Sequence, residues 1–369
     1  MWTMHPTLLV GPADWDAARL PKAEFLDRIA TFWRTCEPGI AGAVVYGGPA
    51  SHAELAYLTH LTPKLEACIA LIPRAGAPRL LVGGGVNMVP AAKPLTWIET
   101  LLPLRDAGTT IARWRDDTNA GALALINGDA MPFGLRASIE TALGAPPVDV
   151  TSLVTAAMCR KSPCELALIR EACASLDAAL AAMRHAQRAG KGMTDTVLAG
   201  EQAAWQRGAQ DVRTLFGRNG GLAPFTVPDN VLADPLQVYV AVRHDGYWAE
   251  GFAALSDAPL PAADAVRAVL AKAITSMRSG GSHREVAQLI VGEIGAARAH
   301  PMTRASFGGD IGLGLDEPEC LSEASDGQFS VDEVYTVRVG LRDNGGSAIV
   351  SAMVLITEHG TKILWPGAE

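Results

Sequence analysis

The sequence lacks the short motifs that mark several common protein classes. It has no GxGxxG followed by an acidic residue, no GxxxxGKS or GxxxxGKT, and no GxSxG, so the usual marks of dinucleotide-binding proteins, P-loop NTPases and α/β-hydrolases are missing. No apolar run approaches the roughly 18 residues that suggest a membrane span. The first residues lack the basic start and long apolar core of a signal peptide. We expect a cytoplasmic protein with no membrane partner.

Cysteine and positive charge are also in short supply. The six cysteines, at positions 36, 68, 159, 164, 173 and 320, form no CxxC pair, which favours reduced thiols over disulfides or a zinc cluster. Lys and Arg number 31 against 39 Asp and Glu, so the net charge is -8. Nucleic acids and anionic membranes select basic faces, and we therefore expect neither as a partner. A small-molecule partner fits this composition better.

The length of 369 residues is enough for two domains of roughly 150 residues each. Hydrophobic residues make up 49% and charged residues 19%, which predicts a sizeable core. In the first half, strand-like segments such as AGAVVYGG, ACIALIPR, PRLLVGGG and ALALINGD are separated by amphipathic stretches. This alternation favours an α/β domain with a largely parallel sheet over residues 1–150. The Pro-rich stretch 144–154 marks the expected domain boundary.

The second half, residues 151–369, opens with a well-marked helix. Ser162 is placed to cap it, Pro163 suits its first turn, and Glu165 completes a capping box. Further helices are predicted from Thr194 to about Trp205, over 262–281 and from Ser282 onward. Strand-like segments accompany them: LQVYVAV, YWAEGFAAL, VYTVRVGLR and SAIVSAMVLITEHG. Grouped helices beside antiparallel strands indicate an α+β domain.

Several segments of this second half, in order, resemble motifs of the creatinase, aminopeptidase P and prolidase family. They are the domain opening RKSPCELALIREA, the hairpin DGYWAE, the GHGIGxxxHExP-like loop GGDIGLGLDEPE, the TxEPG-like strand YTVRVGL and the final strand SAIVSAMVLITEHG. In the first half, ELAYLTHL resembles the NxxYLTGF stretch of the family's smaller N-terminal domain. The resemblance implies an α/β N-terminal domain followed by an α+β domain of the "pita-bread" fold.

Metallopeptidases of that family bind two divalent metals through two Asp, one His and two Glu. The corresponding positions in this chain are Tyr239, Glu250, Gly309, Arg338 and Ser351, with Ala352 beside the last. One of the five keeps a carboxylate, and one has become a guanidinium that has no lone pair for a metal. Two further family histidines that assist catalysis fall on Asp316 and, approximately, on Phe225. The resemblance therefore implies a member without a metal or other cofactor.

The creatinase branch shares the fold and works without metal, cleaving a carbon–nitrogen bond by general acid–base catalysis. Its hairpin carries a glutamate near the place of Glu250, whereas its catalytic histidine has no evident counterpart here. The leading hypothesis is a metal-independent hydrolase of a small, polar, carboxylate-bearing substrate. The alternatives are a lyase that performs an elimination in the same pocket, a non-catalytic homologue that binds a ligand or supports dimer formation, and a metallopeptidase with unusual ligands.

Glu250 is the candidate acid–base residue, with Tyr239 and Asp316 as further catalytic candidates. If a four-residue loop, RHDG, joins the two strands, Tyr239 and Glu250 pair across the hairpin and point the same way. Arg338 either binds a substrate carboxylate in place of the metal charge or neutralises Glu250. Arg342 follows Arg338 at even spacing and is expected to share its face.

Five of the remaining candidates are assigned to the substrate pocket, namely Asp310, Phe225, Trp248, Tyr57 and His60, and all the remaining candidates also have a purely structural reading. Asp310 and Glu317 lie in the glycine-rich loop, where acidic side chains are usually solvated. His244 and Asp245 belong to the hairpin turn. Phe225, Trp248, Tyr57 and His60 are candidate pocket-wall residues. By analogy with the family, we expect a homodimer in which a loop of one N-terminal domain covers the partner's site.

Overall fold

The computed structural model describes residues 13–118, 121–218, 221–225, 230–315, 317, 320–343 and 346–367. The chain divides into two compact units, Met1–Met158 and Cys159–Glu369. The expected boundary after residue 150 lies at the start of helix α7, Thr151–Cys159, which leads from the first unit into the second. Within the described ranges, no helix is both long and apolar enough to cross a bilayer.

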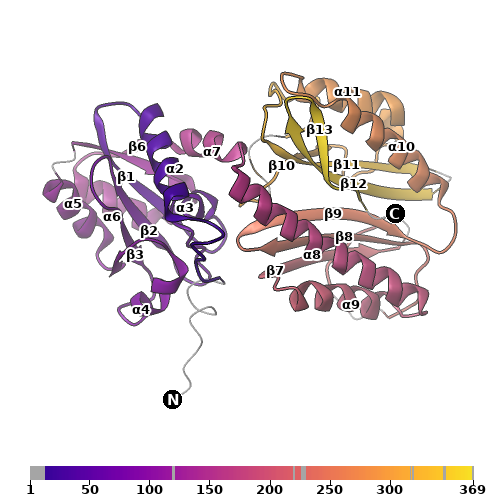
Figure 1. The fold of residues 1–369 in the computed structure, drawn as a ribbon, viewed down its shortest axis with the longest axis horizontal. Helices are drawn as coiled ribbons and strands as arrows, with labels where there is room; N and C mark the ends of the chain where they lie inside the picture. The colour runs from indigo at the N-terminus through magenta and orange to yellow at the C-terminus, as the bar shows by residue number, and fades with distance from the viewer. Residues whose placement is uncertain are drawn as a thin grey trace, which may run out of the picture. The chain divides into compact units, whose positions relative to one another are not determined.

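The first unit is an α/β domain built on one six-stranded sheet (Figure 1). The order is β4-β3-β2-β1-β5-β6, with strands Ile40–Gly47, Cys68–Pro73, Arg79–Val82, Thr100–Pro103, Ala122–Ile126 and Val148–Asp149 for β1 to β6. Its helices are α2 Lys22–Thr35, α3 Ala53–Thr59, α4 Met88–Ala92, α5 Ala107–Asp117 and α6 Phe133–Leu143. The sheet is mixed and not largely parallel as expected, because β1, β2 and β3 pair antiparallel as a meander.

The second unit is an α+β domain in which two similar halves follow one another. Each half has two helices and then antiparallel strands (Figure 1). The first half holds α8 Pro163–Arg188, α9 Met193–Gln206, β7 Asp211–Gly217, β8 Leu236–His244 and β9 Tyr247–Leu255. The second holds α10 Pro261–Ser276, α11 His283–Ile294, β10 Gly308–Asp310, β11 Val334–Asp343, β12 Gly346–Thr357 and β13 Gly360–Trp365. The pita-bread architecture expected from the motifs is confirmed.

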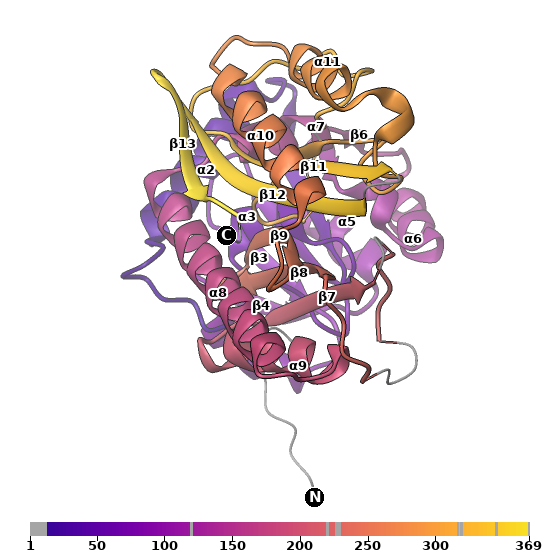
Figure 2. The same cartoon turned by 90° about the vertical axis from the view of Figure 1, so that its right-hand side faces the viewer.

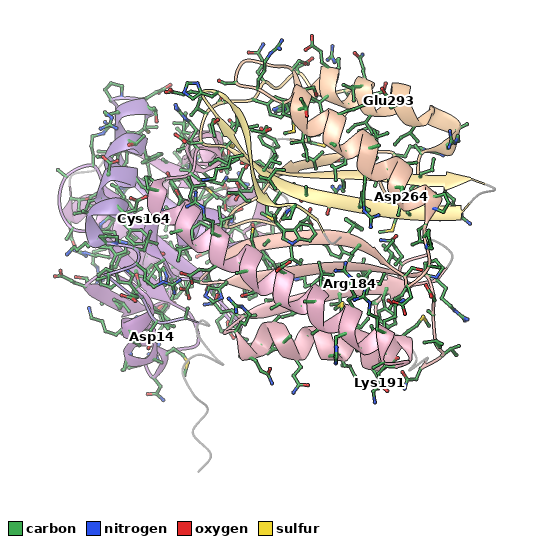
Figure 3. All side chains as sticks on the ribbon, turned by 45° about the vertical axis from the view of Figure 1, so that its right-hand side comes forward. Asp14, Cys164, Arg184, Lys191, Asp264 and Glu293 are labelled. Carbon is green, nitrogen blue, oxygen red and sulfur yellow. The ribbon has the colours of Figure 1, made fainter. Side chains whose placement is uncertain are left out.

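The predicted helices of this unit begin within a residue of their expected starts, but α10 ends at Ser276 and not at the expected residue 281. At the start of α8, the Ser162 hydroxyl accepts from the Glu165 amide at 3.3 Å and the Glu165 carboxylate accepts from the Ser162 amide at 3.0 Å. This reciprocal pair is the predicted capping box, which satisfies two amides that a helix leaves without partners. Figure 3 shows α8 running from beside Cys164 to beside Lys191, along the length of the β7–β9 sheet.

The two sheets of this unit face each other, with the helices outside. Figure 2 shows α8 and α9 on one side and α10 and α11 on the other, with the strands between them. Alternate residues of β11, namely Tyr335, Val337, Val339 and Leu341, join the core beneath α10 and α11. Side chains at the intervening positions therefore point away from the helices. We call the face that points away from the helices the inner face of each sheet.

The side chain of Gln237 fixes which face of β8 is the inner one. Its amide nitrogen donates to the Ile349 carbonyl of β12 at 2.9 Å, and its amide oxygen accepts from the Ile349 amide at 3.0 Å. Residues of β8 at even spacing from Gln237 point the same way, toward the β10–β13 sheet. Tyr239 is one of these residues. The polar side chains on the inner faces of the two sheets therefore point toward each other.

Candidate active site

The five positions aligned with the family's metal ligands lie on five consecutive strands, β8 to β12. All occupy inner-face positions: Glu250 pairs with Ala241 two residues from Tyr239, Arg338 pairs with Ser351, and Gly309 pairs with Thr336 beside Arg338. Residues directly opposite in an antiparallel pair point to the same side of a sheet. The structure thus brings together positions that are spread over more than 100 residues of sequence.

Glu250 is the central carboxylate, and it is only 4% exposed. The Tyr239 hydroxyl donates a hydrogen bond to its Oε2 at 2.7 Å, and Nη1 of Arg338 lies 4.0 Å from its Oε1. The next residue, Gly251, holds β9 tightly against its surroundings, since a Cβ there would stand 2.4 Å from the Trp365 ring. Glu250 is therefore a fixed carboxylate between a phenol and a guanidinium.

The predicted partnership of Tyr239 and Glu250 is correct, but its predicted register is wrong. The hairpin turn has two residues, Asp245 and Gly246, instead of the four-residue loop RHDG. Both adopt positive φ, 46° and 86°, which matches the tight turns that join twisted antiparallel strands. Tyr239 is consequently opposite Phe252 and reaches Glu250 diagonally. A shift of two positions keeps both side chains on the same face.

Arg338 has hydrogen-bonding capacity beyond its contact with Glu250. Its side chain is 20% exposed, and its Nη2 lies 3.5 Å from the Ser306 hydroxyl, at the limit of a hydrogen bond. Its Nε is buried and has no hydrogen-bond partner among the described residues. A guanidinium with donors to spare beside a fixed carboxylate is suited to binding an anion.

Ser306 and Cys320 are not among the sequence candidates, yet Ser306 lies beside Arg338 and Cys320 contacts Ser306. The Cys320 thiol donates to the Ser306 hydroxyl at 3.2 Å, and that hydroxyl donates to the Gly308 carbonyl at 2.8 Å. An isolated β-bridge between Gly309 and Cys320 brings Cys320 close to Ser306. The segment around Ser306 carries no motif, so only the tertiary fold identifies these neighbours.

Ser351 has a structural role in this chain. Its hydroxyl accepts a hydrogen bond from the Phe252 amide at 2.8 Å, which ties β12 to β9. Gly309, on β10, offers no side chain to the site. These two positions therefore supply no ionisable group next to Glu250 and Arg338.

Asp310 and Glu317 form a buried ion cluster with Lys161 instead of facing solvent. The Lys161 Nζ lies 3.0 Å from Asp310 Oδ1 and 2.9 Å from Glu317 Oε2, and the three side chains are 1%, 0% and 3% exposed. Burial raises the pKa of Asp310 well above its usual value, although the ammonium opposes this shift. Burial alone would lower the pKa of Lys161, but the carboxylates outweigh it and raise that pKa.

This cluster is separate from the Glu250 centre. Asp310 is opposite Tyr335, on the helix side of its sheet, so its side chain points away from Arg338. The Glu317 carboxylate also accepts from the Gly314 amide at 3.0 Å, and the Trp248 amide donates to the Gly312 carbonyl at 2.8 Å. The cluster therefore anchors the glycine-rich loop against the β8–β9 hairpin. Asp316, a catalytic candidate, lies outside the described residues.

The other candidates of this unit occupy varied places. Trp248 is buried on the inner face, Arg342 is exposed at the far end of β11, and Phe225 is 41% exposed with its ring 4.8 Å from that of Phe216. His244 pairs with Glu171 of α8 at 3.1 Å, and Asp245 accepts from the Gln210 side chain at 3.1 Å. Among these, Trp248 and Arg342 occupy inner-face positions, Trp248 two residues from Glu250 and Arg342 four residues from Arg338, whose face it shares as expected.

Tyr57 and His60 belong to the first unit and make contacts there. The Arg28 guanidinium lies 4.4 Å from the Tyr57 ring centre, and the His60 ring nitrogen lies 3.0 Å from the Leu95 carbonyl. Their contribution to a partner's site, like the homodimer itself, remains a prediction.

Comparisons with known proteins identify the family. The model of metallopeptidase family M24 matches residues 167–358, more than half of the chain. The chain belongs to this family. No curated protein matches the sequence.

Solved structures share the fold of this family member over nearly its whole length. They include the Xaa-Pro dipeptidase of Bacillus anthracis, with TM-score 0.74, 16% identity, and coverage of 92% of this chain and 97% of that one. The X-Pro aminopeptidase of Thermotoga maritima has TM-score 0.73 and 18% identity, with coverage of 88% of this chain and 95% of that one. The prolidase of Pyrococcus horikoshii has TM-score 0.74 and 16% identity, with coverage of 93% of this chain and 98% of that one. At these identities the likeness establishes the fold, and substrate choice has to be argued from the site.

Proposed function

We propose that the protein is a metal-independent enzyme that acts on a small polar substrate bearing a carboxylate. In this proposal it hydrolyses a carbon–nitrogen bond by general acid–base catalysis. The observation that carries the proposal is the constellation around Glu250, a carboxylate 4% exposed, 2.7 Å from a phenol oxygen and 4.0 Å from a guanidinium nitrogen. It lies where the family keeps its metal ligands, and relatives with a closely similar fold are hydrolases.

Each residue has a defined part in the proposed reaction. Arg338 binds the substrate carboxylate through its remaining donors and so fixes the reacting carbon next to Glu250. Glu250 accepts a proton from a water molecule whose oxygen adds to that carbon. The carbon–nitrogen bond then breaks with its electron pair going to nitrogen, which receives the proton held by Glu250. The Tyr239 hydroxyl orients the carboxylate by donating to its other oxygen.

The donor set supports metal independence. Pairs of divalent ions are held by several carboxylate or imidazole ligands, because these supply negative charge and lone pairs. Over the residues that the structure describes, no three His, Cys, Asp or Glu side chains gather into such a group. The cation Arg338 stands 4.0 Å from Glu250, the carboxylate that remains among the five aligned ligand positions. The residues therefore do not fit the family's dinuclear centre, and no step is assigned to a metal.

Three alternatives compete with the proposed hydrolysis. The contacts of Glu250 with Tyr239 and Arg338 would also suit a non-catalytic protein that only binds a ligand. Hydrolysis of Xaa-Pro dipeptides, the activity for which the Bacillus anthracis protein is named, would follow if the family chemistry survived. An elimination in which Glu250 removes a proton from carbon uses the same residues as the proposed hydrolysis.

A substrate panel separates turnover of a small acid from peptidase activity and from binding without catalysis. The native protein, after EDTA treatment, is incubated with N-carbamoyl and N-amidino amino acids and with Xaa-Pro dipeptides, and release of amine, ammonia or urea is measured. We expect turnover of a carbamoyl or amidino acid that survives EDTA and falls at least 100-fold in Glu250→Gln. The exposed Arg207→Gln, at the end of α9, is the matched control with unchanged turnover. Turnover restricted to Xaa-Pro dipeptides and dependent on added Mn²⁺ would overturn the proposal, as would an active Glu250→Gln.

A further inference from the structure

Two arginines outside the Glu250 centre converge on one tryptophan. The guanidinium carbons of Arg213, on β7, and Arg243, on β8, lie 4.7 and 5.3 Å from the ring centre of Trp248. Trp248 is 3% exposed, so its indole is a fixed surface against which both cations rest. The Arg213 side chain is 57% exposed and that of Arg243 is 13% exposed. One guanidinium is therefore open to solvent and the other is held in place.

Strand register places these arginines on the same inner face as Glu250. Arg213 is opposite Ala241, and Ala241 is opposite Glu250, so the three form one cross-strand row. Arg243 is opposite Trp248 in the adjacent row. The small side chain of Ala241 is all that stands between Glu250 and Arg213 within that row. The arginines and the catalytic carboxylate consequently belong to a single surface.

The two guanidiniums share a carboxylate partner, Asp211. Its Oδ2 lies 3.4 Å from Arg213 Nη2 and 3.8 Å from Arg243 Nη2. Burial lowers the pKa of Arg243, and the neighbouring Arg213 lowers it further, while Asp211 raises it. Holding two guanidiniums together costs free energy, which a bound anion would recover.

We infer that Arg213 and Arg243 form a second oxyanion subsite, so that the molecule bound at Glu250 and Arg338 carries two anionic groups. This inference rests on the proposed function, since Arg338 provides the first subsite. Strands are about 4.8 Å apart and residues rise about 3.4 Å along a strand, which puts Arg213 and Arg243 about 7 to 10 Å from Glu250 at the level of the backbone. A short chain whose first anion binds Arg338, 4.0 Å from Glu250, therefore carries its second anion toward the arginine pair, whose side chains reach inward.

The second anionic group is a carboxylate or a phosphate, because a guanidinium binds either through two parallel hydrogen bonds. Ligand binding to the native chain tests the inference with defined probes: glutarate, 3-phosphonopropionate and the matched monoanion pentanoate. Dissociation constants are measured by calorimetry and checked by the rise in melting temperature. We expect glutarate or 3-phosphonopropionate to bind about tenfold or more tightly than pentanoate. Tighter binding of glutarate identifies a carboxylate as the second group, and tighter binding of the phosphonate identifies a phosphate.

Variants assign the preference to the arginine pair. Arg213→Gln is expected to reduce dianion affinity to that of pentanoate and to leave pentanoate affinity unchanged, whereas Arg338→Met weakens both. Arg213 is substituted first because its side chain is exposed, so the substitution should not disturb folding. Arg243→Gln is tested next, with circular dichroism to verify its fold. Arg207→Gln, on the helix side of the sheet, is the control and should change neither affinity.

Equal binding of glutarate, 3-phosphonopropionate and pentanoate by the native protein would overturn the inference, and so would an undiminished dianion preference in Arg213→Gln. The proposed function fails by a different result, full turnover in Glu250→Gln, which leaves the dianion preference untouched. The two failures are therefore distinguishable.

Discussion

The ion pair between Glu250 and Arg338 can be measured by a double-mutant cycle. The single variants Glu250→Gln and Arg338→Met and their combination are compared with the native chain. Gln keeps the shape of the carboxylate and still accepts the Tyr239 hydroxyl, and Met keeps much of the apolar stem of Arg338. The cycle isolates the interaction of the two charges from the other effects of each substitution.

The structure sets the expected coupling. Two unit charges 4 Å apart attract by about 4 kcal/mol at an effective dielectric constant of about 20. Here the closest N–O distance is 4.0 Å, no direct hydrogen bond joins the pair, and the Arg338 side chain is 20% exposed, so solvent screens the attraction. We expect a favourable coupling of about 1 to 2 kcal/mol, between the values typical of exposed and of buried pairs.

Urea denaturation followed by tryptophan fluorescence gives the free energies of unfolding, with the buried Trp248 as a reporter in the same unit. Arg342→Met is the matched control, because Arg342 lies on the same strand but is exposed. Its coupling with Glu250→Gln should stay within about 0.3 kcal/mol of zero. A coupling at the native pair no larger than this control would refute the idea that Arg338 replaces the metal charge beside Glu250.

Three further predictions concern other buried groups. Lys161→Met leaves two buried carboxylates without their cation and should lower the free energy of unfolding by about 3 to 5 kcal/mol in urea denaturation, whereas Lys22→Met, which breaks an exposed pair, should cost less than about 1 kcal/mol. Burial lowers the pKa of His283 to about 4, so between about pH 6.5 and 4 the unfolded chain binds a proton that the folded chain does not. The free energy of unfolding of the native protein should therefore decrease as the pH falls from about 6.5 to 4, and it should decrease less in His283→Asn. Thermal melts at several pH values measure this difference. Cys164 and Cys320 are partly exposed and should react with iodoacetamide before the four buried cysteines, as peptide mass spectrometry of timed samples would establish; simultaneous labelling of all six would contradict the burial pattern.

Much of the second unit follows from local sequence signals. The Ser162–Glu165 capping box, the helices beginning near Thr194 and Ser282, and the strands that became β8, β9, β11 and β12 were all anticipated, because caps and periodicity act within a few residues. The hairpin register was missed by two positions, since it depends on both turn residues adopting positive φ. Strand direction in the first unit was missed for a similar reason: a strand's own residues do not specify the direction of its neighbour.

The site was partly predictable. Arg338 and Glu250 were identified because each stands at a motif position, and Tyr239 because of its spacing in the hairpin. Lys161 was not paired with Asp310, since 149 residues separate them and no local pattern connects them. Arg243 carries a usable signal, because it is at even spacing from Tyr239 on the same strand. Arg213 needs the additional pairing of β7 with β8, which only the tertiary structure supplies.

Metal binding by the purified protein tests the central claim most directly. The native chain is dialysed to equilibrium against Mn²⁺, Co²⁺ or Zn²⁺. The metal content per chain is then determined by elemental mass spectrometry. With a guanidinium beside Glu250, we expect far less than one equivalent of bound metal, and no rise in melting temperature on adding the ions. Two equivalents bound per chain, lost in Glu250→Gln, would contradict the account.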